Sequence, residues 1–320
     1  MNTKTELSHH KNLMKQWDKY KRMLSRKLGG IPRGWLILSD YCLDDPHKNA
    51  CVTFTISPMQ NLYVLGKQLR EALPRDFKDI GTVPEETLLF LRDYKYFFTI
   101  SIILTDINKS EIVKDLQNMV QYICDNYTKM PPAMIYRIKK FREYLKRKNK
   151  NHNVLKNLSL VALIFSQIVE FLSIKHSAKQ IQWISDRDDV LNIEGGIIFD
   201  IINIITTRLI RGRRRSISLG VGLEDKKAGE YGFDVFIRYP DIVAGAVSSL
   251  DYEKHRVTKP KHLELLINSV FKNPNILMLQ LKNERLNLIR YVPNPKFSSS
   301  AIIRVEKDKN LIPQAPSNLC

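Results

Sequence analysis

Two β-rich runs joined by a short turn constrain the fold of this chain more than any other feature. The runs are WLILSDYCL (35–43) and ACVTFTISP (50–58), and the DDPHKN segment between them is made of turn-forming residues. They predict a β-hairpin, because β-branched and aromatic side chains favour a half-buried pleated surface. The core of the protein is therefore expected to open with two antiparallel strands.

Helical and strand patterns alternate along the rest of the chain. The alternation predicts an α/β fold with a mixed central sheet flanked by helices. Residues 133–175 carry a further helical pattern, which we interpret as an insertion or cap. Apolar spacing and turn signals place helices at 61–73, 84–94, 110–127, 196–210, 239–252 and 262–272, and strands at 96–106, 180–185 and 216–223.

The chain has 320 residues, of which 43% are hydrophobic, and this is enough to form substantial cores. Three segments are expected along it. Residues 1–33 form a basic N-terminal helix that ends at a Gly-Gly-Ile-Pro sequence. Residues 34–255 form the α/β core, with the helical insertion at about 130–178. Residues 256–320 hold a helix, a short hairpin in MLQLKNERLNLIRYV and a Pro-, Ser- and Asn-rich tail that is predicted to be disordered.

The charge balance points to a polyanionic partner. The chain has 51 Lys and Arg against 33 Asp and Glu, a formal net charge of +18. Such a field attracts polyanions over a Debye length of about 8 Å at cellular salt. Nucleic acid, either DNA or RNA, is the expected partner. The alternative is that the charge serves only solubility.

Neither a secretory signal nor a membrane anchor is expected. The N-terminus is polar and charged, without an apolar core. The most apolar segment, 154–174, contains Lys156, Gln167 and Glu170, so a buried helix is a better interpretation than a membrane span.

The cysteines argue for a reducing compartment. Cys42, Cys51, Cys124 and Cys320 show no spacing typical of a zinc site or a secreted disulfide framework. The expected location is the cytoplasm.

Four acidic residues fall at or near the ends of predicted elements. Asp40 lies in the first strand, Asp106 ends the third, Asp186 ends the fourth and Asp241 begins the last core helix. A central sheet brings such ends together, and clustered carboxylates repel each other unless a divalent cation lies among them. The pattern predicts a Mg²⁺ or Mn²⁺ site, with Asp188 as a reserve ligand.

Two metal ions about 4 Å apart can activate water and stabilise the leaving oxygen in phosphodiester cleavage. A basic protein with an acidic centre suits this chemistry. Each acid also has a structural alternative, because Asp is common as a turn former and as a helix N-cap.

Two basic segments are candidates for contact with phosphates, since a dense group of cations repels itself and gains from a polyanion. For the second segment, 208–216, a solvated charged loop is the alternative. The aromatic rings interleaved with the first segment are assigned to core packing. The candidate nucleic-acid-binding residues are Lys139, Lys140, Arg142, Lys146 and Arg147 in the first segment, and Arg208, Arg211, Arg213, Arg214 and Arg215 in the second.

Four segments between about residues 35 and 252 carry an Asp in a recognisable context: LSDYC (38–42), ILTDINK (103–109), WISDRDD (183–189) and RYPDIVAGAVSSL (238–250). Together they resemble a large family of RNase-H-like proteins, common in prokaryotes and mobile elements. The family's first strand reads Tyr-Xaa-Asp-Glu-Ser-Gly, and LSDYC (38–42) keeps its Asp. Its last core helix reads Gln-Leu-Ala-Asp-Leu-Val-Ala-Gly-Ala, and RYPDIVAGAVSSL (238–250) matches it closely from Asp241 to Ala246. ILTDINK (103–109) and WISDRDD (183–189) are similar to the family's strands that end in Asp.

The resemblance implies a ribonuclease-H-like fold and a divalent-metal-dependent nuclease in which Asp40, Asp186 and Asp241 are catalytic. The chain departs from the family at Tyr41, which replaces the Glu, and no Gly follows at the first turn. A second hypothesis is therefore a non-catalytic module that binds nucleic acid or protein in a mobile-element or phage-defence system.

Overall fold

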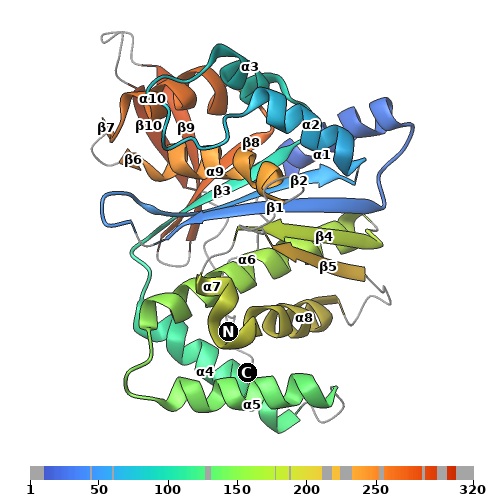
Figure 1. The fold of residues 1–320 in the computed structure, drawn as a ribbon, viewed down its shortest axis with the longest axis vertical. Helices are drawn as coiled ribbons and strands as arrows, with labels where there is room; N and C mark the ends of the chain where they lie inside the picture. The colour runs from blue at the N-terminus through green and yellow to red at the C-terminus, as the bar shows by residue number, and fades with distance from the viewer. Residues whose placement is uncertain are drawn as a thin grey trace, which may run out of the picture.

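An eight-stranded mixed sheet with helices on both faces forms the centre of the protein in the computed structural model (Figure 1). The α/β class and the mixed sheet predicted from the sequence are confirmed. The structure describes residues 11–43, 45–59, 61–126, 131–176, 178–186, 189–210, 218–223, 233–251, 256–282, 285–293 and 301–307.

The strands of the sheet lie in the order β10-β9-β8-β3-β2-β1-β4-β5. The predicted hairpin is present as β1 and β2, and β3 continues it antiparallel to β2. Next to β1, β4 and then β5 run parallel to it, and on the other side β8 runs parallel to β3. The strands are β1 Gly34–Cys42, β2 Ala50–Pro58, β3 Phe98–Thr105, β4 Gln180–Ser185, β5 Ser218–Leu223, β8 Ile276–Lys282, β9 Arg285–Pro293 and β10 Ala301–Lys307.

Strand β1 is buried on both faces, as expected of a central strand between two helical layers. Successive side chains of a strand point to opposite faces, so Trp35 and Ile37 enter one core and Leu36 and Leu38 enter the other. By the same alternation, Asp40 of β1 lies on the side of Leu36 and Leu38.

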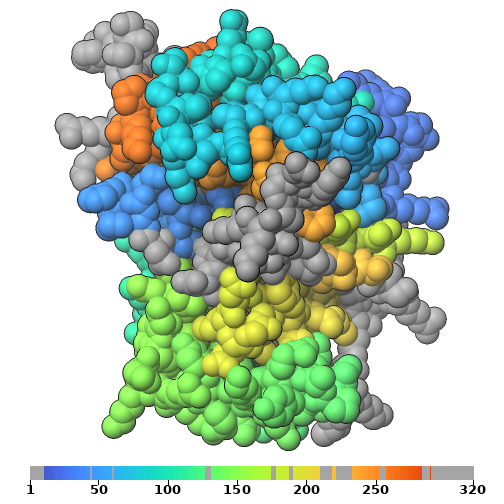
Figure 2. All heavy atoms as spheres, viewed as in Figure 1, coloured from blue at the N-terminus to red at the C-terminus, as the bar shows by residue number. Residues whose placement is uncertain are grey.

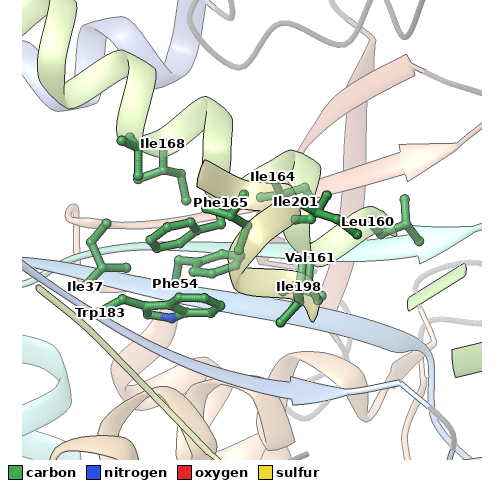
Figure 3. Close-up of a cluster of buried hydrophobic side chains, with 14 of the residues drawn as sticks. Ile37, Phe54, Leu160, Val161, Ile164, Phe165, Ile168, Trp183, Ile198 and Ile201 are labelled. Carbon is green, nitrogen blue, oxygen red and sulfur yellow. The ribbon is translucent and has the colours of Figure 1, made fainter. Parts of the chain in front are cut away.

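The larger core lies between the sheet and helix α6 (Figure 3). Phe165 of α6 stacks on Trp183 of β4 with ring centroids 4.2 Å apart, and Ile37 and Phe54 line the sheet beside them. The helices on this side are α1 Lys11–Leu28, α4 Lys109–Asn126, α5 Pro132–Lys146, α6 His152–His176, α7 Asp189–Asn192 and α8 Ile197–Ile210. Helices α5 and α6 confirm the predicted helical character of 133–175.

By length and apolar composition, α6 could cross a membrane over His152–Ser173. In the fold, 78% of the most apolar 18-residue stretch of this helix is buried within the protein. Its apolar surface is therefore already used in the core, as the polar residues of this segment led us to expect.

The second core lies under α9, which packs across β1 and β2. Ala246 and Val247 of α9 meet Leu36 and Leu38 of β1. The helices on this face are α2 Leu62–Ala72, α3 Glu85–Asp93, α9 Asp234–Ser248 and α10 Pro260–Leu265, which continues into the π-helical turn η4 Leu266–Val270. A short separate ladder pairs β6 Leu250–Asp251 with β7 Arg256–Val257.

Helix α9 differs from its predicted bounds of 239–252. It begins five residues earlier, at Asp234, and Pro240 lies inside it instead of near its first turn. Proline lacks the N–H of one helical hydrogen bond and normally favours a helix start. Here Phe236 and Ile237, on the N-terminal side of the proline, are buried in the second core, and this packing extends the helix past Pro240.

The C-terminal region is part of the main sheet. The hairpin predicted in 278–292 is present as β8 and β9, but β8 also pairs with β3. Residues 301–307, which were predicted to belong to a disordered tail, form β10 on β9. The prediction was wrong there because tail composition carries no information about an available sheet edge.

Candidate functional site

Backbone register places Asp40 and Asp186 side by side. Strand β1 pairs with β4 in parallel, with Ser39 opposite Ser185. One residue further, the N–H of Asp186 donates to the carbonyl oxygen of Ser39 at 3.4 Å. The hydroxyls of Ser39 and Ser185 lie 2.9 Å apart on the α6 side, so Asp40 points to the α9 side.

Helix α9 brings Asp241 to the same side. Asp241 was expected to begin the helix, but it lies in the interior of α9, directly after Pro240. Its neighbours Ile242 and Val243 are buried in the second core, which fixes this turn of α9 against β1 and β2. The three predicted catalytic acids therefore come from β1, from the residue after β4 and from α9.

The three acids interact electrostatically. Asp40 is only 7% exposed, and burial raises its pKa well above the ordinary value, with further increases from the charges of Asp241 and Asp186. Burial raises the pKa of Asp241 to about 6; Lys78 offsets part of this rise, and Asp186 adds to it. The cluster is thus a place where negative charge is costly and where a cation would be stabilising.

Few polar partners satisfy these carboxylates. Asp40 accepts a hydrogen bond from the backbone N–H of Tyr41. Oxygen Oδ1 of Asp186 is buried and has no hydrogen-bond partner within the part of the chain that the structure describes. Buried polar atoms are rarely left in this state, so the Asp186 carboxylate is an acceptor available to a ligand.

The donor chemistry suits a hard divalent cation, since carboxylate oxygens are the ligands that Mg²⁺ and Mn²⁺ prefer. The geometry is less complete. Within the ranges that the structure describes, no three His, Cys, Asp or Glu side chains converge closely enough to hold a metal ion. Asp188, the reserve ligand, lies outside the described residues.

Tyr41, the departure from the family motif, faces away from the acids. Its hydroxyl lies 2.7 Å from Ser39 Oγ and 3.0 Å from Ser185 Oγ, on the α6 side of the sheet. Indole Nε1 of Trp183 donates to the same Ser39 hydroxyl at 2.8 Å. Because adjacent strand residues alternate faces, a glutamate at position 41 would also start from the face opposite Asp40.

Asp106 is not brought to the cluster. Through the pairing of Asp40 with Thr53 and of Thr53 with Ser101, Asp40 is level with Ser101 on β3. Asp106 lies five residues further, about 17 Å along the strand direction. It is exposed, has a positive φ of 51° and forms an ion pair of 2.9 Å with Lys282. Its alternative interpretation as a turn residue fits these features.

Two lysines beside the acids were not predicted. Lys78 lies in the loop between α2 and α3, and its charge lowers the pKa of both Asp40 and Asp241. The charge of Lys48 lowers the pKa of Asp241 as well. The loop is held by Lys261 of α10, whose ammonium donates to the carbonyl oxygens of Phe77 at 2.7 Å, Lys78 at 3.1 Å and Ile80 at 2.8 Å. No local sequence signal links residues more than 180 positions apart.

The predicted basic residues of α5 lie on the far side of the sheet from the acids, and Figure 2 shows α5 and α2 on opposite halves of the molecule. Several of these cations already have partners. Lys140 pairs with Glu194 at 3.2 Å, while Arg142 and Lys146 each approach Glu143 at 3.1 Å. Arg147 lies over the Tyr144 ring. No ion pair involving Lys139 occurs among the described residues.

The interleaved rings divide between core and surface. Phe141 is buried as predicted, but Tyr136 is 70% exposed, so its assignment to the core was wrong. In the second segment, Arg208 lies over the Tyr122 ring at 5.4 Å. Arg211, Arg213, Arg214 and Arg215 lie outside the described residues.

The site is therefore an acidic cluster of the buried Asp40 and the half-buried Asp186 and Asp241, bordered by Lys48 and Lys78, on the α9 face of the sheet. Sequence reasoning identified the acids and missed the lysines. No family model, no curated protein and no solved structure matches this chain.

Proposed function

We propose that this protein is a divalent-metal-dependent nuclease that cleaves phosphodiester bonds of nucleic acid. One observation carries the proposal: Asp40, Asp186 and Asp241 come from separate elements to one place, where Asp40 is buried, each charge opposes the others, and Asp186 has a buried oxygen without a hydrogen-bond partner among the described residues. Such mutually destabilising carboxylates cluster at functional sites more often than in structural positions.

The arrangement of elements supports the ribonuclease-H-like interpretation. A hairpin with Asp40 on its first strand, a parallel strand followed by Asp186 and a helix with Asp241 packed over both strands make up the layout that the resemblance implies. The position of Tyr41 on the other face supports it as well, because this substitution leaves the Asp40 side unchanged.

In this proposal the three carboxylates hold Mg²⁺ or Mn²⁺, and their oxygens move closer together than they lie in the structure. A bound cation lowers the pKa of water and offsets charge on the leaving oxygen. Lys48 and Lys78 contribute positive charge at the rim of the site, where a phosphate oxygen can approach. The charge of +18 and the cysteine usage support a cytoplasmic protein that acts on nucleic acid.

Calorimetric titration of Mn²⁺, run beside a cleavage assay, tests the proposal. Wild-type protein should bind Mn²⁺ and cut at least one of single-stranded or duplex DNA and RNA. Asp186→Asn should lose both properties, whereas the matched control Asp106→Asn, an exposed Asp at the end of β3, should keep both. Cleavage by Asp186→Asn at the wild-type rate would refute the catalytic assignment.

A second candidate is a non-catalytic module that binds nucleic acid or protein. It is favoured by the absence, within the described residues, of three side chains that converge on a metal position. It predicts nucleic-acid binding in EDTA, no Mn²⁺ uptake and no cleavage of any substrate. In that case we would infer a role in a mobile-element or phage-defence system, as the resemblance implies.

A further inference from the structure

Helix α1 carries a row of cations along one side. Residues spaced three or four apart on a helix are neighbours, so positions 11, 15, 19, 22 and 26 form one continuous stripe. All five side chains are exposed. We call this the α1 stripe, and it consists of Lys11, Lys15, Lys19, Arg22 and Arg26.

The opposite side of α1 is fixed in the core. Leu13, Trp17, Tyr20 and Leu24 are at most 1% exposed. The Trp17 ring packs 5.5 Å from Trp35, 5.0 Å from Phe98 and 5.1 Å from Phe171. The Tyr20 hydroxyl also donates to the carbonyl oxygen of Tyr96 at 2.7 Å. The stripe is therefore presented by a rigid element.

The positive charge of the stripe is only partly offset within the described part of the chain: Asp18 lies on the same side of the helix, three residues after Lys15 and four before Arg22. Asp18 is the acidic residue of α1, and Arg22 donates to its backbone carbonyl oxygen rather than to its carboxylate. None of the five cations forms an ion pair with a described acidic side chain. Like charges at these spacings destabilise a helix by about 0.2–0.5 kcal/mol per pair. A polyanion would relieve this repulsion.

The C-terminal half of the stripe borders a surface hollow of about 500 Å³, lined by Lys19, Arg22, Met23, Arg26 and Lys27. Four of the five lining residues are cations. Four cationic residues around one hollow make this a region of positive charge that attracts phosphate groups.

We infer that the α1 stripe binds the sugar-phosphate backbone of a nucleic acid. This inference deepens the proposed function by naming a second surface that holds the substrate. A membrane surface is the competing polyanion. An interfacial helix, however, inserts its apolar side into lipid, and the apolar side of α1, which includes Trp17 and Tyr20, is already packed in the larger core.

The position of α1 defines what the stripe does. Trp17 contacts Trp35 near the start of β1, whereas Asp40 lies five residues further on the opposite face, about 17 Å along the strand. The stripe itself extends over about 22 Å, at 1.5 Å per residue. Because the stripe and the acids lie on opposite faces of the sheet, only a substrate long enough to pass around the sheet can contact both, so the stripe aids long substrates more than short ones.

Fluorescence anisotropy with labelled 30-nucleotide single-stranded RNA, single-stranded DNA and duplex DNA tests the inference in EDTA. The stripe variant combines Lys15→Gln, Lys19→Gln and Arg22→Gln. The matched control removes the same charge elsewhere, through Lys67→Gln, Lys109→Gln and Lys114→Gln, which are exposed on α2 and α4. Circular dichroism confirms that both variants are folded.

The stripe variant should bind at least one of these probes at least tenfold more weakly. The slope of log Kd against log salt should fall by about 2–3, because each phosphate contact contributes about 0.7–0.9. The control should change neither quantity by half as much. Equal effects in the two variants would show that only net charge matters, and no effect in the stripe variant would also overturn the inference.

Two further arms separate the alternatives. Binding of phosphatidylserine-containing vesicles that is lost in the stripe variant, with nucleic-acid binding unchanged, would assign the stripe to a membrane instead. Asp186→Asn in EDTA should bind nucleic acid as the wild type does. If the wild type fails to cleave while the stripe effect persists, the nuclease proposal falls and the stripe inference stands.

Discussion

The backbone N–H of Asp186 donates to the carbonyl oxygen of Ser39, and this bond extends the pairing of β1 and β4 one residue beyond the end of β4. It sets Asp186 beside Asp40 without any bond between their side chains. Backbone register thus holds two carboxylates near each other despite their repulsion. The repulsion between these carboxylates destabilises the folded state, so changes in their charge should alter stability as well as activity.

Asp241→Asn should make the protein more stable at neutral pH. The folded pKa of Asp241 is about 6, above the ordinary value of 3.8, so between these values the folded state keeps a proton that the unfolded state loses. Stability therefore falls as pH rises through this window. Removing the charge should raise the free energy of unfolding by about 1–3 kcal/mol at pH 7, and by less at pH 4.5.

Urea unfolding at pH 7 and pH 4.5 measures this difference. Asp106→Asn serves as the control, because Asp106 is exposed and distant in register, and it should shift stability by no more than about 0.5 kcal/mol. If Asp241 has only a structural role, Asp241→Asn should instead be neutral or destabilising at both pH values.

Mn²⁺ should raise the melting temperature of the wild-type protein. A ligand that binds only the folded state at 100 times its Kd stabilises it by about 2.7 kcal/mol. Protons compete for the same carboxylates, since the pKa of Asp241 is raised to about 6, so the shift should be smaller at pH 5 than at pH 7.5. Differential scanning fluorimetry of the wild type and Asp40→Asn, with and without Mn²⁺, checks this. An equal shift in both proteins would place the metal elsewhere.

The local features of this fold could be predicted from the sequence. The β1–β2 hairpin follows from two β-rich runs and the DDPHKN turn, which lie within 25 residues of each other. The bounds of α9 could not be predicted, because the preference of Pro240 for a first turn was overridden by the burial of Phe236 and Ile237 in the second core. Local propensity is a weak guide where tertiary packing decides.

Some features of the candidate site could likewise be predicted from the sequence, and others could not. Its three acids were predicted from their places at the ends of elements and from the resemblance, but their meeting depends on Ser39 pairing with Ser185, 146 residues away. Lys78 was missed because its loop is positioned by Lys261. Neither contact has a signature in the neighbouring sequence.

Tyr41→Phe should reduce stability without affecting the acidic cluster. The hydroxyl of Tyr41 contacts Ser39 and Ser185 on the α6 side of the sheet, and its loss should cost about 0.5–1.5 kcal/mol. Mn²⁺ affinity and cleavage should remain within about twofold of the wild type. Titration calorimetry beside urea unfolding measures both properties. A large loss of metal affinity would show that position 41 acts on the Asp40 side after all.

Lys261→Met should loosen the loop that carries Lys78. The ammonium of Lys261 donates to three carbonyl oxygens of this loop and lies 4.7 Å from the centre of the Phe77 ring. Methionine keeps most of the side-chain volume and removes these interactions. The free energy of unfolding should fall by about 2–3 kcal/mol, and the loss is limited because the freed carbonyl oxygens can bind water. Lys259→Met, an exposed neighbour at the N-cap of α10, is the control.

Limited trypsin digestion followed by mass spectrometry reports on this loop, because trypsin cleaves after Arg75 and Lys78. Cleavage there should be several-fold faster in Lys261→Met than in the wild type or in Lys259→Met. Nuclease turnover should fall in parallel, since Lys78 acts on both Asp40 and Asp241 and its position depends on the loop. Unchanged digestion at these two sites would mean that the loop keeps its conformation without the ammonium, and Lys261 would then have no positioning role.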